Sequence, residues 1–386
     1  MNTTIKKSRD TSPSLPSRVA LAIDAGFGLM KFTRRADDGT AECDFFPSIA
    51  LDADSGEDNG ADSGLRRDAL TVEYDGRRYS VGKHVRDEMV ANDFGRDMTD
   101  AYYDSRVYHA LMRGALGYMG EEHINTLVLG LPMHQYENKD RVNALQDSYT
   151  GEIEINPGHS VQIDRAVVHP QPYGGYINLG SRLNEINAVL AQYPESGIAA
   201  LKSQKDLASL NVLIVDPGAF TLDWLLMTPT GANRKVSSAA SDAGRHRVIR
   251  AVHEIVQAEL GRPVGSAFFP RIDDAIRAGR PIRIGGRLID LSAPAYKKAI
   301  EKAVEDPVRQ LLEGLRGMDD LIDLIAVMGG EPRDVANAIR RERPYLPVFC
   351  AAESDGQNSS MYSNLLGFQS YAKAIDAKFA KEELVS

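Results

Sequence analysis

Runs of apolar residues alternate with amphipathic stretches along most of the chain. The run from Val19 to Ile23 leads directly into Asp24 and a glycine-bearing turn, which predicts a buried strand that ends at a charged site. A second buried strand is predicted by "INTLVLGLP", and helices are predicted by Tyr102–Met119 and by "KDRVNALQDSY". Because strands and helices alternate, the pattern indicates an α/β fold.

The opening pattern returns in the second half of the chain. "RVALAIDAGFGLMKF" and "NVLIVDPGAFTLDWLLM" each contain an apolar strand, Asp-x-Gly, a tight turn and a second apolar strand. Aligning the two copies places Asp24 on Asp216 and Lys31 on Asp223. A single Asp and Gly after a strand often make only a turn. Two copies about half a chain apart indicate that the molecule is built from two related halves.

Other segments predict local features. The stretch Asp52–Asp68 is rich in Asp, Gly and Ser and predicts a mobile surface loop, and "LTVEYDGRRYSVG" predicts a hairpin. "GGYINLGSRLNEINAVLAQY" predicts a glycine turn followed by a helix. Ser241 or Asp242 is the expected cap of the helix in "SDAGRHRVIRAVHEIV", and "RIDDAIRAGR" predicts a solvated helix face.

Composition limits the class of function. The chain has 386 residues, 43% of them hydrophobic and 26% charged, and a net charge of -9, which offers no general basic surface for nucleic acid. Cys43 and Cys350 are too few for a disulfide framework or a zinc site, as in a reducing compartment. No apolar segment precedes Val19, and no stretch reaches the roughly 18 apolar residues of a membrane span. We therefore expect a cytoplasmic protein without membrane contact.

The repeated hairpins point to phosphate binding. Glycines in both turns let backbone N–H groups approach a phosphate closely, and two facing hairpins could clamp a chain of phosphates. Lys31 would meet the phosphate charge. Asp24 and Asp216 would hold Mg²⁺, mostly through its waters, because this ion prefers oxygen ligands and dehydrates reluctantly. The residues by themselves thus predict a two-lobed phosphate-binding protein. "GFG" lacks the third glycine of a dinucleotide fingerprint and "VGKH" lacks the Walker spacing, which argues against both sites.

The motifs resemble the nucleotide-binding signatures of the actin, Hsp70 and sugar-kinase superfamily. The first hairpin resembles its phosphate-1 motif, "DPGAFTLD" its phosphate-2 motif and "LIAVMGGEP" its adenosine motif, in the right order. A closer resemblance, over Val19–Phe368, is to plasmid-segregation actins of the ParM/StbA type and among them to the actin-like protein of PRTRC systems. It is carried by "IDAGFGLMK", "CDFFPS", "VLGLPMHQY" and "VVHPQPYGG". The resemblance implies an actin-like (RNase H-like) two-lobed α/β fold with duplicated halves and a nucleotide cleft between them.

The resemblance also implies a domain organisation. It gives a disordered N-terminal tail at 1–18, domain I at 19–172 with a small subdomain at about 43–100, domain II at 173–354, and a C-terminal helix at 355–386 that returns to domain I.

The implied function is an ATPase that polymerises with ATP or GTP and Mg²⁺ into filaments and segregates plasmid DNA. Because the chain is acidic, the DNA would be reached through a DNA-binding adaptor on the plasmid centromere, without direct contact. Two alternatives within the superfamily are a small-molecule kinase and a chaperone-like nucleotide switch that does not polymerise. A chaperone would need a substrate domain after the adenosine motif, yet only about fifty residues follow Gly330. No second constellation supplies the carboxylate base of a kinase.

The resemblance assigns catalytic roles to Gln171, which would orient the attacking water, and to Asp216. A structural alternative, compatible with the first, is that Pro170, Gln171 and Pro172 form a rigid hinge strand, and His169 beside them is expected to be structural. The sequence departs from the family pattern at three positions, where Ala219, Phe220 and Glu331 replace small, hydroxyl or glycine residues. The expected nucleotide contacts are Asp24, Gly26, Phe27, Gly28, Lys31, Gly218, Ala219, Phe220, Thr221, Asp242, Gly244, Gly329, Gly330 and Glu331, with Asp24 and Asp216 as the Mg²⁺ ligands.

Overall fold

The computed structural model describes most of the chain, namely residues 18–53, 68–85, 100–265, 268–315, 317–355 and 360–383. Two of the sequence predictions concern residues outside these ranges. The expected N-terminal tail lies outside them except for Arg18, and so does most of the expected loop rich in Asp, Gly and Ser.

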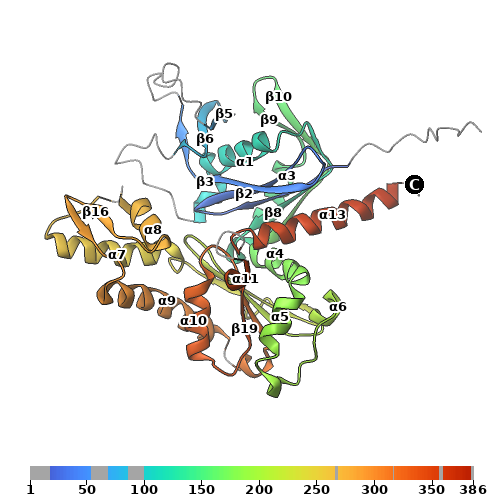
Figure 1. Ribbon diagram of the computed structural model, residues 1–386. Helices are drawn as coiled ribbons and strands as arrows, with labels where there is room; N and C mark the ends of the chain where they lie inside the picture. Colours follow the sequence, from blue (N-terminus) through green and yellow to red (C-terminus); the bar gives the residue numbers. More distant parts are fainter. Residues whose placement is uncertain are drawn as a thin grey trace, which may run out of the picture.

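The first lobe, lobe I, is built on a mixed sheet with strand order β11-β8-β1-β2-β3 (Figure 1). The central strand β1 pairs antiparallel with β2 and parallel with β8. Its apolar residues are buried because helices cover both sides of the sheet, α1 on one side and α13 on the other. The bounds are β1 Ala20–Ala25, β2 Leu29–Arg35, β3 Ala41–Pro47, β8 Thr126–Leu131, β11 Ala166–Pro170, α1 Arg106–Met119 and α13 Ser363–Glu383.

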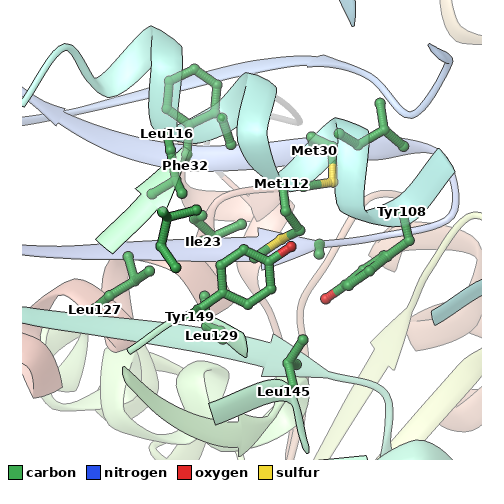
Figure 2. Packing of buried hydrophobic residues seen from close by; sticks show 14 of the residues in the cluster. Ile23, Met30, Phe32, Tyr108, Met112, Leu116, Leu127, Leu129, Leu145 and Tyr149 are labelled. Atoms are coloured by element: carbon green, nitrogen blue, oxygen red, sulfur yellow. The ribbon is translucent and has the colours of Figure 1, made fainter. Parts of the chain in front are cut away.

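The core of lobe I lies between this sheet and α1. Figure 2 shows that Ile23, Phe32 and Leu127 from the strands face Met112 and Leu116 from the helix. All five side chains are buried, which follows from the alternation of strand residues and from the apolar face of α1. The core therefore fixes the strand register that brings Asp24 to the end of β1.

Smaller elements surround lobe I. The predicted hairpin is present: β5 and β6 pair across a turn at Asp75 and Gly76, which both have positive φ, as a tight hairpin turn requires. The remaining elements are β4 Ala50–Asp52, β5 Ala69–Tyr74, β6 Arg77–Gly82, η2 Asp100–Asp104, β7 His123–Ile124, α2 Met133–Tyr136, α3 Lys139–Ser148, β9 Gly151–Asn156 and β10 His159–Ile163.

The second lobe, lobe II, repeats this plan. Its main sheet has the order β14-β13-β12-β18-β19, with β12 antiparallel to β13 and parallel to β18. The strands are β12 Val212–Pro217, β13 Leu222–Thr228, β14 Gly231–Ala232, β15 Ser238–Ala240, β18 Leu324–Val327 and β19 Val348–Cys350. Around it lie η4 Pro194–Ser196, α5 Leu183–Leu190, α6 Gln204–Leu207, α7 Arg245–Leu260, α8 Phe269–Arg277, β16 Ile282–Ile284, β17 Arg287–Ile289, α9 Pro294–Gly314, η6 Asp319–Leu321, α10 Pro332–Glu342 and α11 Ala351–Asp355.

The duplication extends to the residue level. In lobe I, Asp24 lies opposite Lys31 across β1 and β2; in lobe II, Asp216 lies opposite Asp223 across β12 and β13. Both hairpins therefore have the same register, as the sequence alignment of the two copies predicts. The prediction of two related halves is confirmed.

Two helices join the lobes, α13 and α4 (Gln171–Asn178, continued by η3 Leu179–Ser181). They cross so closely that a Cβ on Gly174 would lie 2.3 Å from the Asn364 carbonyl oxygen, and one on Gly367 would lie 1.8 Å from that of Gly174. Glycine is therefore required at both positions. The prediction of a glycine turn here is wrong, because Gly174 and Gly175 lie inside α4, where a close helix crossing requires them.

One further local prediction is wrong and another is wrong in part. The N-cap of α7 is Gly244, and neither Ser241 nor Asp242 fills that position. The solvated face predicted for Asp273 and Asp274 on α8 holds for the exposed Asp274, whereas the Asp273 side chain accepts a hydrogen bond from the buried Arg245. Within the described ranges, no helix combines the length and apolar character needed to cross a membrane.

Candidate functional site

A cavity of about 950 Å³ lies between the lobes, and both repeated hairpins line it. It collects most of the residues predicted from the sequence, although those come from distant parts of the chain. The predicted residues that line it are Asp24, Gly26, Phe27, Gly28, Lys31, Gln171, Asp216, Gly218, Ala219, Thr221, Gly330 and Glu331. Phe220, Asp242, Gly244 and Gly329 are not among the lining residues.

The turns of the two hairpins have the same hydrogen bond. The Gly26 N–H donates to the Leu29 carbonyl at 3.0 Å, and the Gly218 N–H donates to the Thr221 carbonyl at 2.9 Å. Each turn thus places a glycine backbone two residues after an aspartate near the end of a strand. This arrangement exposes little side-chain bulk toward the cavity, which suits close approach by an anionic ligand.

The tips of the two turns meet each other. The rings of Phe27 and Phe220 have centroids 5.4 Å apart, and a Cβ placed on Gly28 would lie 2.7 Å from the Cβ of Ala219. Phe220 therefore contributes by contacting the opposite turn, although it does not line the cavity. Ala219 and Phe220, the departures from the family pattern, both lie at this contact between the lobes.

Asp24 connects three elements at the lobe I wall. Its carboxylate forms an ion pair with Lys31 on β2 and accepts a hydrogen bond of 2.8 Å from the Gln171 side-chain amide. The same amide donates to the Ala25 carbonyl at 3.2 Å. Gln171 is the first residue of α4, so Pro170, Gln171 and Pro172 form a junction between strand and helix and not a hinge strand. The junction points the Gln171 side chain into the cavity.

Asp216 forms the opposite wall. It is buried, and one carboxylate oxygen accepts a hydrogen bond of 2.6 Å from Asn364 on α13. A Cβ on Gly329 would lie 2.2 Å from the other oxygen, so the glycine after β18 is required by the position of this carboxylate. Burial raises the pKa of Asp216 from 3.8 to about 7; Lys31 lowers it, and Asp24 adds to the rise.

This raised pKa predicts how stability depends on pH. Between about pH 4 and pH 7 the folded protein holds a proton on Asp216 that the unfolded chain releases, so stability falls as the pH rises. Asp216→Asn should therefore stabilise the protein, free of nucleotide and divalent cations, by about 3 kcal/mol more at pH 8 than at pH 5. Urea unfolding at both pH values measures this difference.

The matched control is Asp206→Asn. Asp206 is not buried in the core, and hydrogen bonds from Lys202 and Ser203 lower its pKa, so this variant should show no such gain at high pH. If Asp216→Asn changes the free energy of unfolding by the same amount at both pH values, Asp216 does not take up a proton on folding.

Asp223 occupies the position of Lys31 in the second hairpin but has a different role. It accepts hydrogen bonds from the Met133 backbone N–H at 2.8 Å and from the Thr221 hydroxyl at 2.5 Å. Burial raises its pKa. Because Met133 belongs to α2 of lobe I, Asp223 links the two lobes behind the cavity. As an acidic residue, Asp223 cannot bind an anionic ligand in the way that is expected of Lys31.

The N-terminus of α7 lies against the second turn. The Arg245 and His246 backbone N–H groups donate to the carbonyls of Gly218 and Ala219 at 3.0 and 2.8 Å. A Cβ on Gly244 would lie 2.5 Å from the Gly218 carbonyl oxygen, which explains the glycine. Gly244 thus acts through the second turn, and Asp242 forms an ion pair with Arg250 outside the cavity lining.

Glu331 belongs to a charged group at the cavity rim. Its carboxylate pairs with Arg277 at 2.5 Å, with the Arg245 guanidinium 3.9 Å away, and Arg245 donates to Asp273 at 2.6 Å. Burial raises the pKa of Glu331, and the two arginines lower it. The residue that replaces a third glycine therefore joins α10 to α7 and α8 at the edge of the cavity.

His169 faces aromatic rings and does not line the cavity. Its ring packs edge-on against Tyr371 at 4.6 Å and lies 4.9 Å from Tyr173. Burial lowers its pKa to about 4, which keeps the ring neutral. These surroundings agree with a structural residue.

The cavity suits a polyphosphate bound with a divalent cation. Lys31 and the turn backbones favour anionic groups, whereas Asp24 and Asp216 would repel them unless a cation lies between. The described residues contain no group of three or more His, Cys, Asp or Glu side chains able to hold a metal by themselves. A cation that is bound partly by phosphate oxygens of the ligand would need only the two carboxylates of Asp24 and Asp216 from the protein.

Comparisons with known proteins agree with this geometry. The family described as "Actin like proteins N terminal domain" matches residues 22–174, and solved structures of actin homologues superpose on almost the whole chain. The fold is actin-like. The archaeal actin homologue Ta0583 is 18% identical with a TM-score of 0.67, covering 92% of this chain and 99% of its own. It has also been solved in complex with ADP.

Two filament structures share this actin-like fold. A 15-stranded ParM filament from Clostridium botulinum is 17% identical with a TM-score of 0.64, covering 92% of this chain and 99% of its own. The AlfA filament bound to AMPPNP is 15% identical with a TM-score of 0.57, covering 94% and 99%. No curated protein sequence matches the chain.

Several residues of the cavity were not predicted. Asn364, Arg245, Asp273 and Arg277 reach it from helices whose sequences resemble ordinary amphipathic segments. The available signal was weak: Arg245 follows a glycine at a helix start, and Asn364 follows Ser363 directly before Leu365 and Leu366.

Proposed function

We propose that the protein is an actin-like ATPase that polymerises with ATP or GTP into filaments and segregates plasmid DNA. The observation that carries this proposal is the pair of hairpins with identical register, which bring Asp24 and Asp216 to one cavity between two lobes. In the proposed site the nucleotide phosphates lie between the two turns, with Lys31 on their charge. Gly329, Gly330 and Glu331 border the nucleoside, and Gly244 supports the second turn.

Nucleotide binding is supported by the chemistry of the cavity and by the ADP complex of Ta0583. Asp24 and Asp216 would hold Mg²⁺, which would neutralise phosphate charge. Hydrolysis would use Gln171, the first residue of α4, to orient the attacking water. Hydrogen bonds to the Asp24 carboxylate and the Ala25 carbonyl hold its side-chain amide in place. Asp216, on the opposite wall, would share the electrostatic part of catalysis.

Polymerisation is supported by the shape of the site. A ligand clamped between two lobes favours the closed arrangement, and a head-to-tail interface that fits the closed arrangement extends without closing into a ring. The filament structures of Clostridium botulinum ParM and AlfA have this actin-like fold. Hydrolysis would then weaken the polymer by releasing the closed state.

The biological setting belongs to the same proposal. A role in plasmid segregation, and the closer relation to the actin-like protein of PRTRC systems, are proposed because the sequence motifs resemble those of these proteins. The acidic chain would reach plasmid DNA through a DNA-binding adaptor at the centromere, in the cytoplasm. The domain boundaries at 172 and 354 and the subdomain at about 43–100 are part of the proposal.

The proposal predicts nucleotide-dependent assembly. With ATP or GTP and Mg²⁺ the protein should sediment above a critical concentration and scatter light, and with ADP it should sediment less, because hydrolysis releases the lobes. Pelleting at rising protein concentration with ATP, GTP, ADP and a slowly hydrolysed analogue, followed by electron microscopy, tests this. A protein that stays monomeric in all four and phosphorylates a sugar or an acid would instead be a small-molecule kinase.

A further inference from the structure

The free end of lobe II carries an excess of arginines. Here the hairpin of β16 and β17 packs with α8 against α7 through a separate apolar cluster, at the left edge of Figure 1. Residues 262–289 contain six arginines and two acidic residues, in a chain of net charge -9. Arg277 points to the cavity rim and pairs with Glu331. The other five arginines are exposed, and we call them the arginine tip: Arg262, Arg271, Arg280, Arg283 and Arg287.

In the part of the chain that the structure describes, no carboxylate lies within ion-pair distance of the arginine tip. Arg287 donates to the Glu259 backbone carbonyl at 3.1 Å, Arg283 to that of Gly286 at 3.5 Å and Arg271 to that of Arg283 at 3.1 Å. Arginines elsewhere on the surface, such as Arg340, have carboxylate partners. The guanidinium groups of the tip are therefore available to an acidic partner.

The tip also exposes an apolar side chain. Leu288 is 63% exposed and lies opposite Arg283 across the hairpin, whereas Ile282 and Ile289 are buried beneath it. Arginines around an exposed large apolar residue are typical of protein interfaces, where Arg is enriched and apolar contacts exclude water. A surface for the phosphates of DNA would not need Leu288. The chemistry of the tip therefore favours an acidic protein surface.

Exposed acidic side chains on lobe I offer the opposite charge. Five acidic residues on α3, β9 and the segment before α3 are exposed, and within the described residues none pairs with Lys, Arg or His. Glu152 and Glu154 point to the same side of β9, because Ile153 and Ile155 between them are buried in the core. We call these residues the acidic edge: Glu137, Asp140, Asp147, Glu152 and Glu154.

We propose that the arginine tip of one copy of this chain docks on the acidic edge of the next copy; this inference rests on the filament function proposed above. The two surfaces belong to different lobes, so their contact joins unlike ends of two copies and repeats along a polymer. Opposite charge steers the encounter and sets its register, and Leu288 supplies a desolvated contact at its centre.

Charge reversal tests the pairing. Arg283→Glu/Arg287→Glu and Glu152→Arg/Glu154→Arg should each raise the critical concentration for pelleting at least about tenfold, because like charges then meet. An equimolar mixture of the two variants should assemble close to the wild-type concentration, since each kind of contact in an alternating polymer again joins opposite charges. Circular dichroism confirms that each variant is folded, as expected when only exposed side chains change.

The control for the Arg283→Glu/Arg287→Glu variant is Lys373→Glu/Lys378→Glu on α13, which makes the same change in net charge at exposed positions outside both surfaces and should assemble as wild type. If the Arg283→Glu/Arg287→Glu variant pellets like wild type, the inference fails and the filament function stands. If both variants fail and their mixture also fails, these surfaces do not pair.

Two further outcomes are decisive. If the wild type shows neither a polymer nor salt-sensitive self-association with any nucleotide, both proposals fail. If the Arg283→Glu/Arg287→Glu variant still assembles but loses binding to a labelled DNA duplex that the wild type binds, the tip is a polyanion site and the inference is overturned.

Discussion

Replacing Asp24 with alanine should lower the rate of nucleotide hydrolysis by about 1000-fold. Asp24 fixes both Lys31 and Gln171, and it is one of two carboxylates that would hold Mg²⁺. The substitution removes the charge partner of the lysine and the acceptor of the glutamine in one step. Single-turnover hydrolysis with Mg²⁺ and ATP or GTP measures the loss.

The informative control is Asp24→Asn. Asparagine keeps the shape and can accept the Gln171 hydrogen bond, but it cannot form the ion pair with Lys31. The hydrolysis rate of Asp24→Asn should lie between the rates of wild type and Asp24→Ala. The difference between the two variants separates the positioning of Gln171 from the effect of the Asp24 charge. Hydrolysis by a folded Asp24→Ala protein within tenfold of wild type would rule out the proposed role.

Gln171→Ala should slow the chemical step by roughly 10-fold to 1000-fold while nucleotide affinity changes little. The reason is that misplacing a reacting group costs on this scale, whereas the phosphates would be held by other residues. Single-turnover kinetics report the chemical step, and calorimetric titration reports the affinity.

A matched control is Gln369→Ala. This glutamine is also buried, but it donates to the Ala20 carbonyl and accepts from Thr33 away from the cavity. Its removal should lower stability by about 1 kcal/mol and leave the hydrolysis rate unchanged. If Gln171→Ala behaves like Gln369→Ala, the role of Gln171 is only to join the strand and helix at the lobe junction.

The hairpins could be predicted to the residue because their signal is local. Strand alternation, Asp-x-Gly and the turn all lie within about fifteen neighbouring residues, so Asp24, Lys31 and Asp216 could be placed from sequence alone. The repeat of this signal indicated two related halves, whereas the α/β class followed from the alternation of strands and helices and the actin-like fold from the resemblance of the motifs. The cavity-lining glycines of the two turns, Gly26, Gly28 and Gly218, were found in the same way.

The cavity residues that could not be predicted from the sequence depend on contacts between distant segments. Asn364 reaches Asp216 only because α13 crosses α4, and that crossing requires Gly174 and Gly367. From the sequence, glycines at that point predicted a turn. Asp273 gains its role from Arg245, which lies in another helix. No local pattern encodes such pairings, so they become visible only in three dimensions.

The position of α13 has a consequence for how the protein is made. This helix follows lobe II in the chain, yet Leu365, Phe368 and Ala372 cover Ala22 and Val128 of the first sheet. Arg18 at the start of lobe I also pairs with Asp376 near the end of the helix. During synthesis from the N-terminus, that side of the sheet stays uncovered until α13, which follows lobe II in the chain, leaves the ribosome. Lobe I is therefore begun before lobe II but completed only after it, and a chain cut before α13 exposes an apolar sheet that is prone to aggregate.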